Sequence, residues 1–299
     1  ITMSPSFSFI SLSFLLLSLL SFTLAESQKQ TQVWMCLERC DNYTPAQIEK
    51  NLDIIKTHSK QSLTSVSYEI YNIGANGTIY QNDDLTAVHE TLAQYDSFYE
   101  GQKLKTFPMI SSYPYPPELI NWMRYTFAHP DEFVSSVLEH ITKLEPKCSG
   151  VNVDFEPVSG ITVQDSIDYA KFLNYFSNAL AQKGYETQVD VASWNVLWNY
   201  TLLGQQENVK SIVTMSTYAG PQESWTKAFA KATTEIPIQK LNVGLMSTNP
   251  TGGKYLTNEE IVWRFENMKQ KGVQSVSVWR MTNEIPDQWW KSFEDFLRN

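Results

Sequence analysis

The feature that most constrains the fold of this chain is a regular alternation between short β-branched or apolar runs and longer amphipathic stretches. Such alternation is typical of β-α units, in which helices join parallel strands. Eight strands are predicted, at Thr31–Cys36, Leu63–Ile70, Lys103–Ile110, Gly150–Phe155, Glu186–Ala192, Ser211–Thr217, Lys240–Met246 and Ser275–Trp279.

The stretches between these runs predict helices. The first has Pro45 at its opening position, and Gln47 follows Thr44 at the spacing of a capping box. The helices are predicted at Thr44–His58, Leu85–Tyr95, Pro130–Leu144, Val163–Gln182, Ser224–Thr234, Asn258–Lys271 and Pro286–Leu297, with an irregular, partly helical piece at Val196–Gln206. Eight strands with eight helical connections favour an α/β fold, a single closed (β/α)8 TIM barrel, over an open doubly wound sheet.

The first 25 residues carry no charge and are rich in Leu, Ser and Phe. We interpret residues 1–25 as a secretory signal peptide, cleaved after Ala25, which leaves one domain at 26–299. A membrane anchor is the alternative, because the apolar run is almost long enough to span a bilayer. The first interpretation predicts a secreted or lysosomal protein without a membrane span in its mature form. It also makes the sequons at Asn42, Asn76 and Asn199 candidate glycosylation sites.

Cysteine and histidine spacing gives no sign of a metal site or of a cofactor. Cys36 and Cys40 could form a disulfide only if the chain turns between them, because four extended steps span about 13 Å and a disulfide needs Cα atoms within about 7 Å. Cys148 would then be left over. The four histidines are expected to be surface or packing residues: His58, His89, His129 and His140.

The charge of the chain bears on its partners. A net charge of -9, with no basic run and no Gly-rich phosphate loop, argues against a nucleic-acid partner. A neutral or polar substrate is more natural for such a surface.

Three polar side chains alternate along the predicted fourth strand. The two-residue period of a strand sends Asn152, Asp154 and Glu156 to one face. Two neighbouring carboxylates disfavour each other's ionisation, so burying them suggests a chemical use, although a structural hydrogen-bonded pair is the alternative. In a closed barrel the working residues lie at the carboxyl ends of the strands, which is where this group falls.

Aromatic residues collect at the same predicted strand ends, where they would suit stacking on sugar rings. For any single one of them, packing in the barrel is the competing interpretation. They are Trp34, Tyr68, Tyr71, Tyr113, Trp194, Tyr218 and Trp279.

The stretch Ser-Gly-Val-Asn-Val-Asp-Phe-Glu at 149–156 resembles the Asp-x-x-Asp-x-Asp-x-Glu signature of glycoside hydrolase family 18, the chitinase-like barrels. Asp154 and Glu156 match the last two acidic positions, whereas Ser149 and Asn152 replace the first two. In having Asn152 at the second of these positions and a small domain, the chain resembles the di-N-acetylchitobiase branch of the family.

Other segments carry the resemblance further. Met215–Ala219 is similar to the family's Met-x-Tyr-Asp segment, with Tyr218 on its tyrosine and Ala219 in place of its Asp. Ser277–Trp279 resembles the segment with the closing tryptophan. The third strand departs from the family, because Ser111–Pro114 stands where Ser-x-Gly-Gly is common. About ten residues follow the seventh strand, so the α+β insertion domain is missing, which implies a shallow cleft and short substrates.

The resemblance implies a substrate-assisted, retaining hydrolysis in which the substrate's own acetamido oxygen is the nucleophile. Glu156 would be the acid, and the charge on Asp154 would disfavour loss of its proton. Asp154 and Tyr218 would orient the acetamido group, and Asn152 would hydrogen-bond to Asp154. The substrate-binding residues would be Trp279, Trp194, Tyr68, Tyr113 and Met215.

These residues predict a glycosidase that cleaves β-1,4-linked N-acetylglucosamine in chitin fragments or in the core of N-glycans. The alternative is a carbohydrate-binding relative without hydrolytic activity, which the replacements at Ser149 and Ala219 favour.

Overall fold

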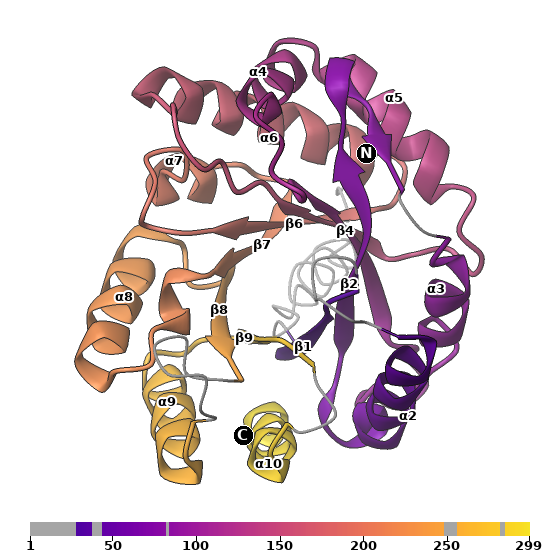
Figure 1. Cartoon of the computed structure of the whole chain (residues 1–299). Helices are drawn as coiled ribbons and strands as arrows, with labels where there is room; N and C mark the ends of the chain where they lie inside the picture. Colours follow the sequence, from indigo (N-terminus) through magenta and orange to yellow (C-terminus); the bar gives the residue numbers. More distant parts are fainter. Residues whose placement is uncertain (1–27, 38–43, 82–83, 248–255, 282–284) are drawn as a thin grey trace, which may run out of the picture.

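The structure is a computed structural model that describes residues 28–37, 44–81, 84–247, 256–281 and 285–299. These residues form one closed barrel of parallel strands surrounded by helices (Figure 1). The predicted signal peptide at 1–25, the sequon at Asn42 and the cysteine at Cys40 lie outside the described residues. In the described part, no helix combines the length and the apolar character that crossing a membrane requires.

Eight parallel strands make the wall of the barrel, and the (β/α)8 prediction is confirmed. Gln32 closes the sheet, because it pairs with Ser65 on the second strand and with Ser277 on the last. The strands are β1 (Gln30–Met35), β2 (Ser65–Ile73), β4 (Lys105–Ser111), β5 (Gly150–Asp154), β6 (Glu186–Val191), β7 (Val209–Thr214), β8 (Leu241–Met246) and β9 (Ser275–Trp279).

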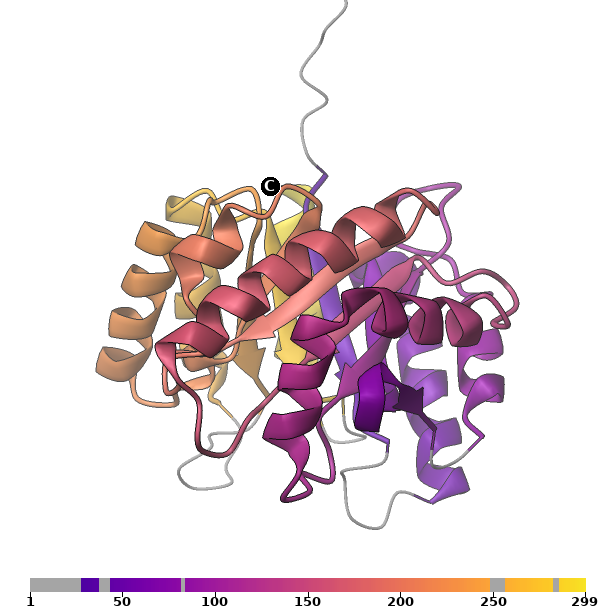
Figure 2. The same ribbon diagram turned by 90° about the horizontal axis from the view of Figure 1, so that it is seen from above.

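Helices pack along the outside of this wall, as Figure 2 shows from above. The predicted capping box at Thr44 is present: its hydroxyl accepts from the backbone N–H of Gln47, whose side chain accepts from the N–H of Thr44. The helices are α2 (Pro45–Ser62), α3 (Thr86–Leu92), α4 (Leu119–Ala128), α5 (Pro130–Ile141), α6 (Val163–Ala181), α7 (Tyr200–Gly204), α8 (Gln222–Glu235), α9 (Asn258–Gln270) and α10 (Asp287–Arg298).

Two elements were not predicted from the sequence. A short strand, β3 (Ile79–Tyr80), pairs antiparallel with the end of β2 after a turn at Ala75–Gly77, where Asn76 and Gly77 have φ angles of 55° and 67°. The helix α4 precedes α5 and packs against α6. Neither alters the barrel, because both are additions between β2 and β5.

An aromatic cluster outside β5 fixes the direction of its side chains. Phe155 is fully buried and packs against Tyr169 and Phe172 of α6, with ring centroids 6.1 and 6.3 Å away. Since alternate residues of an extended chain point to opposite sides, Phe155 facing outward directs Asp154 and Glu156 toward the barrel axis. The apolar packing thereby positions the two acids.

Candidate functional site

A pocket with a volume of about 230 Å³ opens at the carboxyl ends of the strands. We call it the strand-end pocket. Its walls come from the ends of β5, β6, β8 and β9 and from the loops after β4, β5, β6 and β7. Its lining residues are Tyr115, Asp154, Glu156, Asp190, Trp194, Met215, Tyr218, Met246 and Trp279.

The two predicted acids reach this pocket together. Asp154 is 3% exposed, whereas Glu156 is partly exposed. Ser112, in the loop after β4, holds the backbone between them: its hydroxyl accepts from the N–H of Glu156 at 2.7 Å, and its own N–H donates to the carbonyl of Asp154 at 3.2 Å. The chain segment that carries the acids is therefore tied to the neighbouring strand.

Tyr115 contacts Glu156 directly, because its hydroxyl donates to Oε1 at 3.1 Å. Its backbone has a φ of 61°, which is an outlier for a bulky residue and marks a position under functional or structural constraint. Tyr113, rather than Tyr115, was predicted to bind the substrate. Tyr113 packs edge-on against the ring of Tyr115, with centroids 6.1 Å apart, and is not among the residues that line the pocket.

A third carboxylate, Asp190 on β6, also lines the pocket and was not singled out from the sequence. It is 3% exposed, and its Oδ1 accepts from Nδ2 of Asn152 at 2.9 Å. The predicted hydrogen bond from Asn152 to Asp154 was therefore wrong. The amide of Asn152 instead reaches diagonally across to β6, where Gln188 is its partner in the register and Asp190 lies two residues further toward the pocket.

The phenol of Tyr169 lies behind these acids. Its burial, followed by the charges of Asp190 and Asp154, raises its pKa well above the usual value. Tyr169 is fully buried. Tyr169 belongs to the aromatic cluster outside β5 and does not line the pocket, and its phenol keeps its proton at neutral pH.

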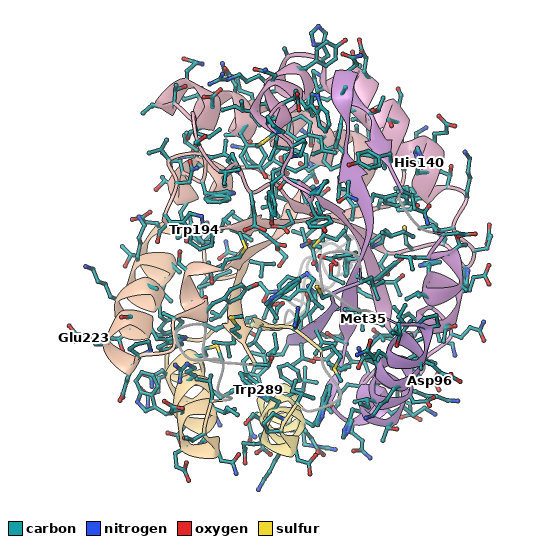
Figure 3. The ribbon with its side chains drawn as sticks, viewed as in Figure 1. Met35, Asp96, His140, Trp194, Glu223 and Trp289 are labelled. Atoms are coloured by element: carbon teal, nitrogen blue, oxygen red, sulfur yellow. The ribbon has the colours of Figure 1, made fainter. Side chains whose placement is uncertain are left out.

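Aromatic residues form the remaining wall. Trp279 at the end of β9 is partly exposed and meets Trp34, inside the barrel, edge to face with centroids 6.3 Å apart. Trp194 is 60% exposed at the rim and rests edge-on against Trp198, with centroids 5.5 Å apart. Figure 3 places Trp194 close to α7, on the opposite side of the barrel from Asp96.

The position of Tyr218 depends on a glycine in the next strand. A Cβ atom at Gly244 would lie 2.9 Å from the ring of Tyr218 and 2.3 Å from the carbonyl oxygen of Thr214. Only a residue without a side chain fits there. The structure thus brings Trp279, Trp194, Met215 and Tyr218 together, as the sequence analysis expected.

Tyr68 does not reach the pocket, so its predicted role in substrate binding was wrong. It is fully buried between β2 and α3, where its hydroxyl is 2.6 Å from Nδ1 of His89. Tyr71 likewise faces outward, edge-on to His140 of α5. The residue beside Tyr68 that turns inward is Glu69, whose Oε2 accepts from the N–H of Leu37.

Other predicted residues lie away from the pocket or on its margin. Cys36 is disulfide-bonded, and Cys148 is buried and free. The sequon asparagines Asn76 and Asn199 are exposed, and Asn199 also caps α7. Within the described ranges, no group of three or more His, Cys, Asp or Glu residues is arranged to hold a metal ion.

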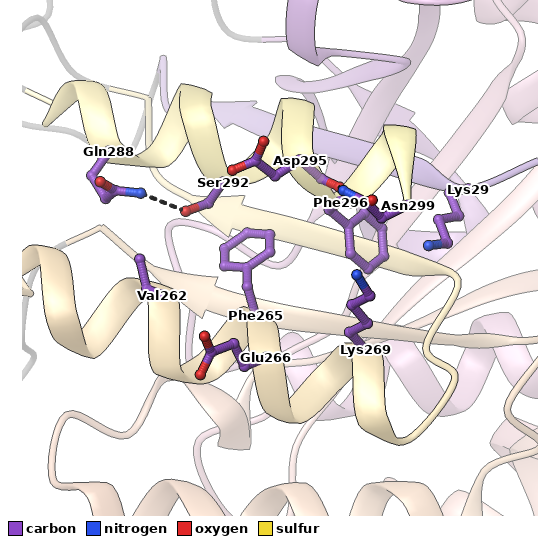
Figure 4. Close-up of a pocket in the computed structure, with 10 residues that line it drawn as sticks. All are labelled: Lys29, Val262, Phe265, Glu266, Lys269, Gln288, Ser292, Asp295, Phe296 and Asn299. Carbon is purple, nitrogen blue, oxygen red and sulfur yellow. Dashed lines mark hydrogen bonds between the residues drawn. The ribbon is translucent and has the colours of Figure 1, made fainter.

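A larger cavity, of about 390 Å³, lies between α9 and α10 (Figure 4). We call it the α9–α10 groove. The rings of Phe265 and Phe296 form its floor, and Gln288 donates to Ser292 at one end. Lys29, which precedes β1, reaches its other end, so the groove lies on the outside of the barrel toward the amino ends of the strands.

Solved structures share the fold over about nine tenths of the chain, although no family model matches the sequence and no curated protein matches it. A chitinase from Chromobacterium violaceum aligns with a TM-score of 0.68 and 14% identity, over 91% of this chain and 99% of that one. A second match is catalytic domain 2 of the Group II chitinase from Ostrinia furnacalis, solved as a mutant in complex with an N-acetylchitooligosaccharide. It aligns with a TM-score of 0.68 and 12% identity, over 90% of this chain and 96% of that one.

A chitinase-like agglutinin from Robinia pseudoacacia aligns equally well, with a TM-score of 0.68 and 12% identity over 89% of this chain and 99% of that one. The neighbours thus include both enzymes and a lectin, and identities this low speak for the fold alone. The resemblance to the di-N-acetylchitobiase branch stays a prediction. The protein has the barrel fold of the chitinases and chitinase-like proteins.

Proposed function

We propose that this protein is a glycoside hydrolase that cleaves β-1,4-linked N-acetylglucosamine in chitin oligosaccharides or in the core of N-glycans. The observation that carries the proposal is the carboxyl group of Glu156. It faces the strand-end pocket, receives a hydrogen bond from Tyr115, and shares the pocket with buried Asp154 and with Trp279.

The chemistry proceeds in two steps. Glu156 gives its proton to the glycosidic oxygen while the substrate's acetamido oxygen attacks the anomeric carbon, so the leaving sugar departs and a cyclic oxazolinium forms. Water then attacks the same carbon and returns its proton to Glu156. The acetamido group is thereby restored, and the anomeric configuration is retained.

The other pocket residues would prepare the substrate for this attack. Asp154 and Tyr218 would hold the acetamido group, with Asp154 accepting from its N–H. Asp190, fixed by Asn152, adds negative charge that favours the cationic anomeric carbon of the transition state. The indole of Trp279 offers a flat apolar face for the sugar ring.

The size of the pocket favours short substrates. Its volume of about 230 Å³ is below the range of about 300–1,000 Å³ that is typical of ligand pockets. The strand-end pocket therefore encloses little more than the reacting sugar, and the remaining sugars would lie in the open cleft beside Trp194.

Incubation with tri-N-acetylchitotriose tests the proposal. The wild-type protein should release N-acetylglucosamine or chitobiose, and the Glu156→Gln variant, which keeps the shape but not the acid, should not. The proposal is wrong if the wild type shows no turnover of chitotriose or of an N-glycan core between pH 4 and pH 8.

A sugar-binding protein without hydrolytic activity is the second candidate. Ala219 and Ser149 replace acids of the family signature, and an agglutinin has the same fold. This candidate predicts that wild type and Glu156→Gln bind chitotriose equally well in calorimetry and that neither consumes it.

We also propose that the mature protein passes through the secretory pathway. The uncharged apolar stretch at 1–25 and the exposed sequon asparagines Asn76 and Asn199 support this. Expression of the full chain in a eukaryotic host should give a product whose mass falls after treatment with an endoglycosidase. A product of unmodified mass that stays inside the cell would contradict it.

A further inference from the structure

A second hollow adjoins the strand-end pocket. It has a volume of about 650 Å³, and four residues line both spaces: Trp194, Met215, Tyr218 and Met246. We call it the side compartment. The two spaces share these residues as a common boundary, so they lie side by side at the carboxyl ends of the strands.

One face of α8 forms the outer wall of the side compartment. Ser224, Lys227, Ala228 and Lys231 all line it, and their spacing of three, four and seven residues places them on a single helix face. Ala228 is small, which leaves space between the two lysines. The face therefore lines the hollow with two lysine side chains.

The two lysines differ in their partners. Lys231 pairs with Glu235 one turn further along α8, and its ammonium lies 5.2 Å from the ring centroid of Tyr200. Lys227 is exposed and forms no ion pair with any described residue. Lys227 thus has its full charge available for a ligand, and Lys231 would have to share its own.

The charge of the side compartment is opposite to that of the strand-end pocket. Among the described residues, the strand-end pocket is lined by three acids, Asp154, Glu156 and Asp190, and by no basic residue. The described lining of the side compartment contains the two lysines and no Asp or Glu. Ala219 contributes to this contrast, because a carboxylate at that position would place a negative charge in the side compartment.

Two hydroxyl groups also line the side compartment. The Oγ of Ser216 accepts from the N–H of Ser193 at 2.7 Å and lies 2.8 Å from the Oγ of Ser193, so the two hydroxyls are held side by side. Ammonium and hydroxyl groups together supply donors for an oxygen anion. The exposed indole of Trp194 separates this polar wall from the carboxylates.

We propose that the side compartment binds an anionic substituent, a carboxylate or a sulfate ester, on the sugar next to the one in the strand-end pocket. The inference rests on the proposed function only in placing an N-acetylglucosamine unit in that pocket. Lys227 and Lys231 would then select charged glycans over neutral ones. A chain with a net charge of -9 otherwise repels such ligands, so the local positive charge decides the preference.

Calorimetry in the Glu156→Gln background tests the preference, because the ligand is not consumed. The probes are chitotriose, its 6-O-sulfated form and its carboxymethyl form, each at 20 mM and 200 mM NaCl. We expect one or both anionic forms to bind about threefold to tenfold more tightly than the neutral form at low salt, with a smaller difference at high salt.

Variants locate the effect. Lys227→Gln and Lys231→Gln together should abolish the preference and leave the affinity for chitotriose within about twofold. The matched control is Lys210→Gln, an exposed lysine near the amino end of β7, which should change nothing. Ala219→Asp should weaken only the binding of the anionic forms.

The outcomes separate this inference from the proposed function. Equal affinity for neutral and anionic forms overturns the inference, even if the wild type hydrolyses chitotriose. A preference that survives in the double lysine variant overturns it as well. A preference that depends on the lysines supports it, even if the wild type hydrolyses no probe, which would count against hydrolysis alone.

Discussion

The strand-end pocket and the α9–α10 groove differ in how their side chains are supplied. The groove is the larger, at about 390 Å³ against about 230 Å³, but two neighbouring helices supply most of its lining. The strand-end pocket draws its side chains from four strands and four loops. Residues far apart in the sequence converge there, which a simple packing defect does not produce.

Charge separates the two regions further. The groove has two basic and two acidic residues, Lys29, Lys269, Glu266 and Asp295, on an exposed surface where the signs balance. The strand-end pocket concentrates three acids, two of them nearly fully buried. Burying like charges costs free energy, so convergence and charge indicate function here better than volume does.

The largest expected effect is at the acid of the strand-end pocket. Glu156→Gln should lower kcat on chitotriose by about 10²–10⁴-fold, because the amide cannot give a proton to the leaving oxygen. Steady-state kinetics of the purified variant measure this. A variant that retains more than a tenth of the wild-type rate would mean that Glu156 is not the acid.

A substitution in the α9–α10 groove should change the stability of the protein and not its activity. Phe296→Ala removes a buried ring that packs against Phe265, and it should lower the free energy of unfolding by about 3 kcal/mol. The activity of the folded fraction should stay unchanged. Urea unfolding followed by kinetics measures both quantities. A loss of kcat in the folded protein would show that the groove takes part in function.

The Asn152–Asp190 hydrogen bond offers a smaller test of the strand-end pocket. Asn152→Ala removes a hydrogen-bond donor to the buried carboxylate of Asp190 and should cost about 1–3 kcal/mol. If Asp190 serves the reaction, the pH profile of kcat should shift as well as the stability. An unchanged profile with lowered stability would assign the pair to the fold alone.

A salt bridge behind the pocket should give a pH-dependent effect. Hydrogen bonds from Arg124 hold the pKa of Asp165 well below its usual value, and Arg124 also donates to the carbonyl of Gly160 in the loop after Glu156. Because the folded-state pKa is lowered, the stabilisation is full above the unfolded value of about 4 and is lost as the pH falls through the folded value.

Asp165→Asn should therefore cost about 1 kcal/mol at pH 7, a modest figure because Arg124 is partly exposed to solvent. The difference from wild type should shrink as the pH falls below about 4. Urea unfolding at pH 7 and pH 3 measures it. Asp168→Asn, at a partly exposed acid in the same helix, is the matched control and should cost less. If the stability difference between Asp165→Asn and wild type is the same at both pH values, the lowered pKa of Asp165 does not stabilise the fold.

The sequence predicts the barrel and the two acids for the same reason. Both depend on local periodicity: apolar runs alternate with amphipathic stretches, and a period of two along β5 places Asp154 and Glu156 on one face. The direction of that face follows from Phe155, which packs outward. Local patterns of this kind can be read without knowing which strands are neighbours.

The other pocket residues depend on neighbours in space. Asp190 comes into the site because β6 lies beside β5, and Tyr115 because its loop adopts a positive φ next to Glu156. Tyr68 was assigned to the wrong face, because β2 is buried on both sides and its sequence shows no polar alternation that fixes which side turns inward. Which residues become neighbours in space, and which face of β2 turns inward, can be seen only in the folded chain.

The most direct test of the account is a crystal structure of the Glu156→Gln variant with chitotriose. We predict one sugar ring stacked on Trp279 in the strand-end pocket. The side chain that replaces Glu156 should lie within about 3 Å of a glycosidic oxygen, and the acetamido group should lie beside Asp154 and Tyr218. An empty strand-end pocket with sugar bound elsewhere, such as in the α9–α10 groove, would contradict the central claim.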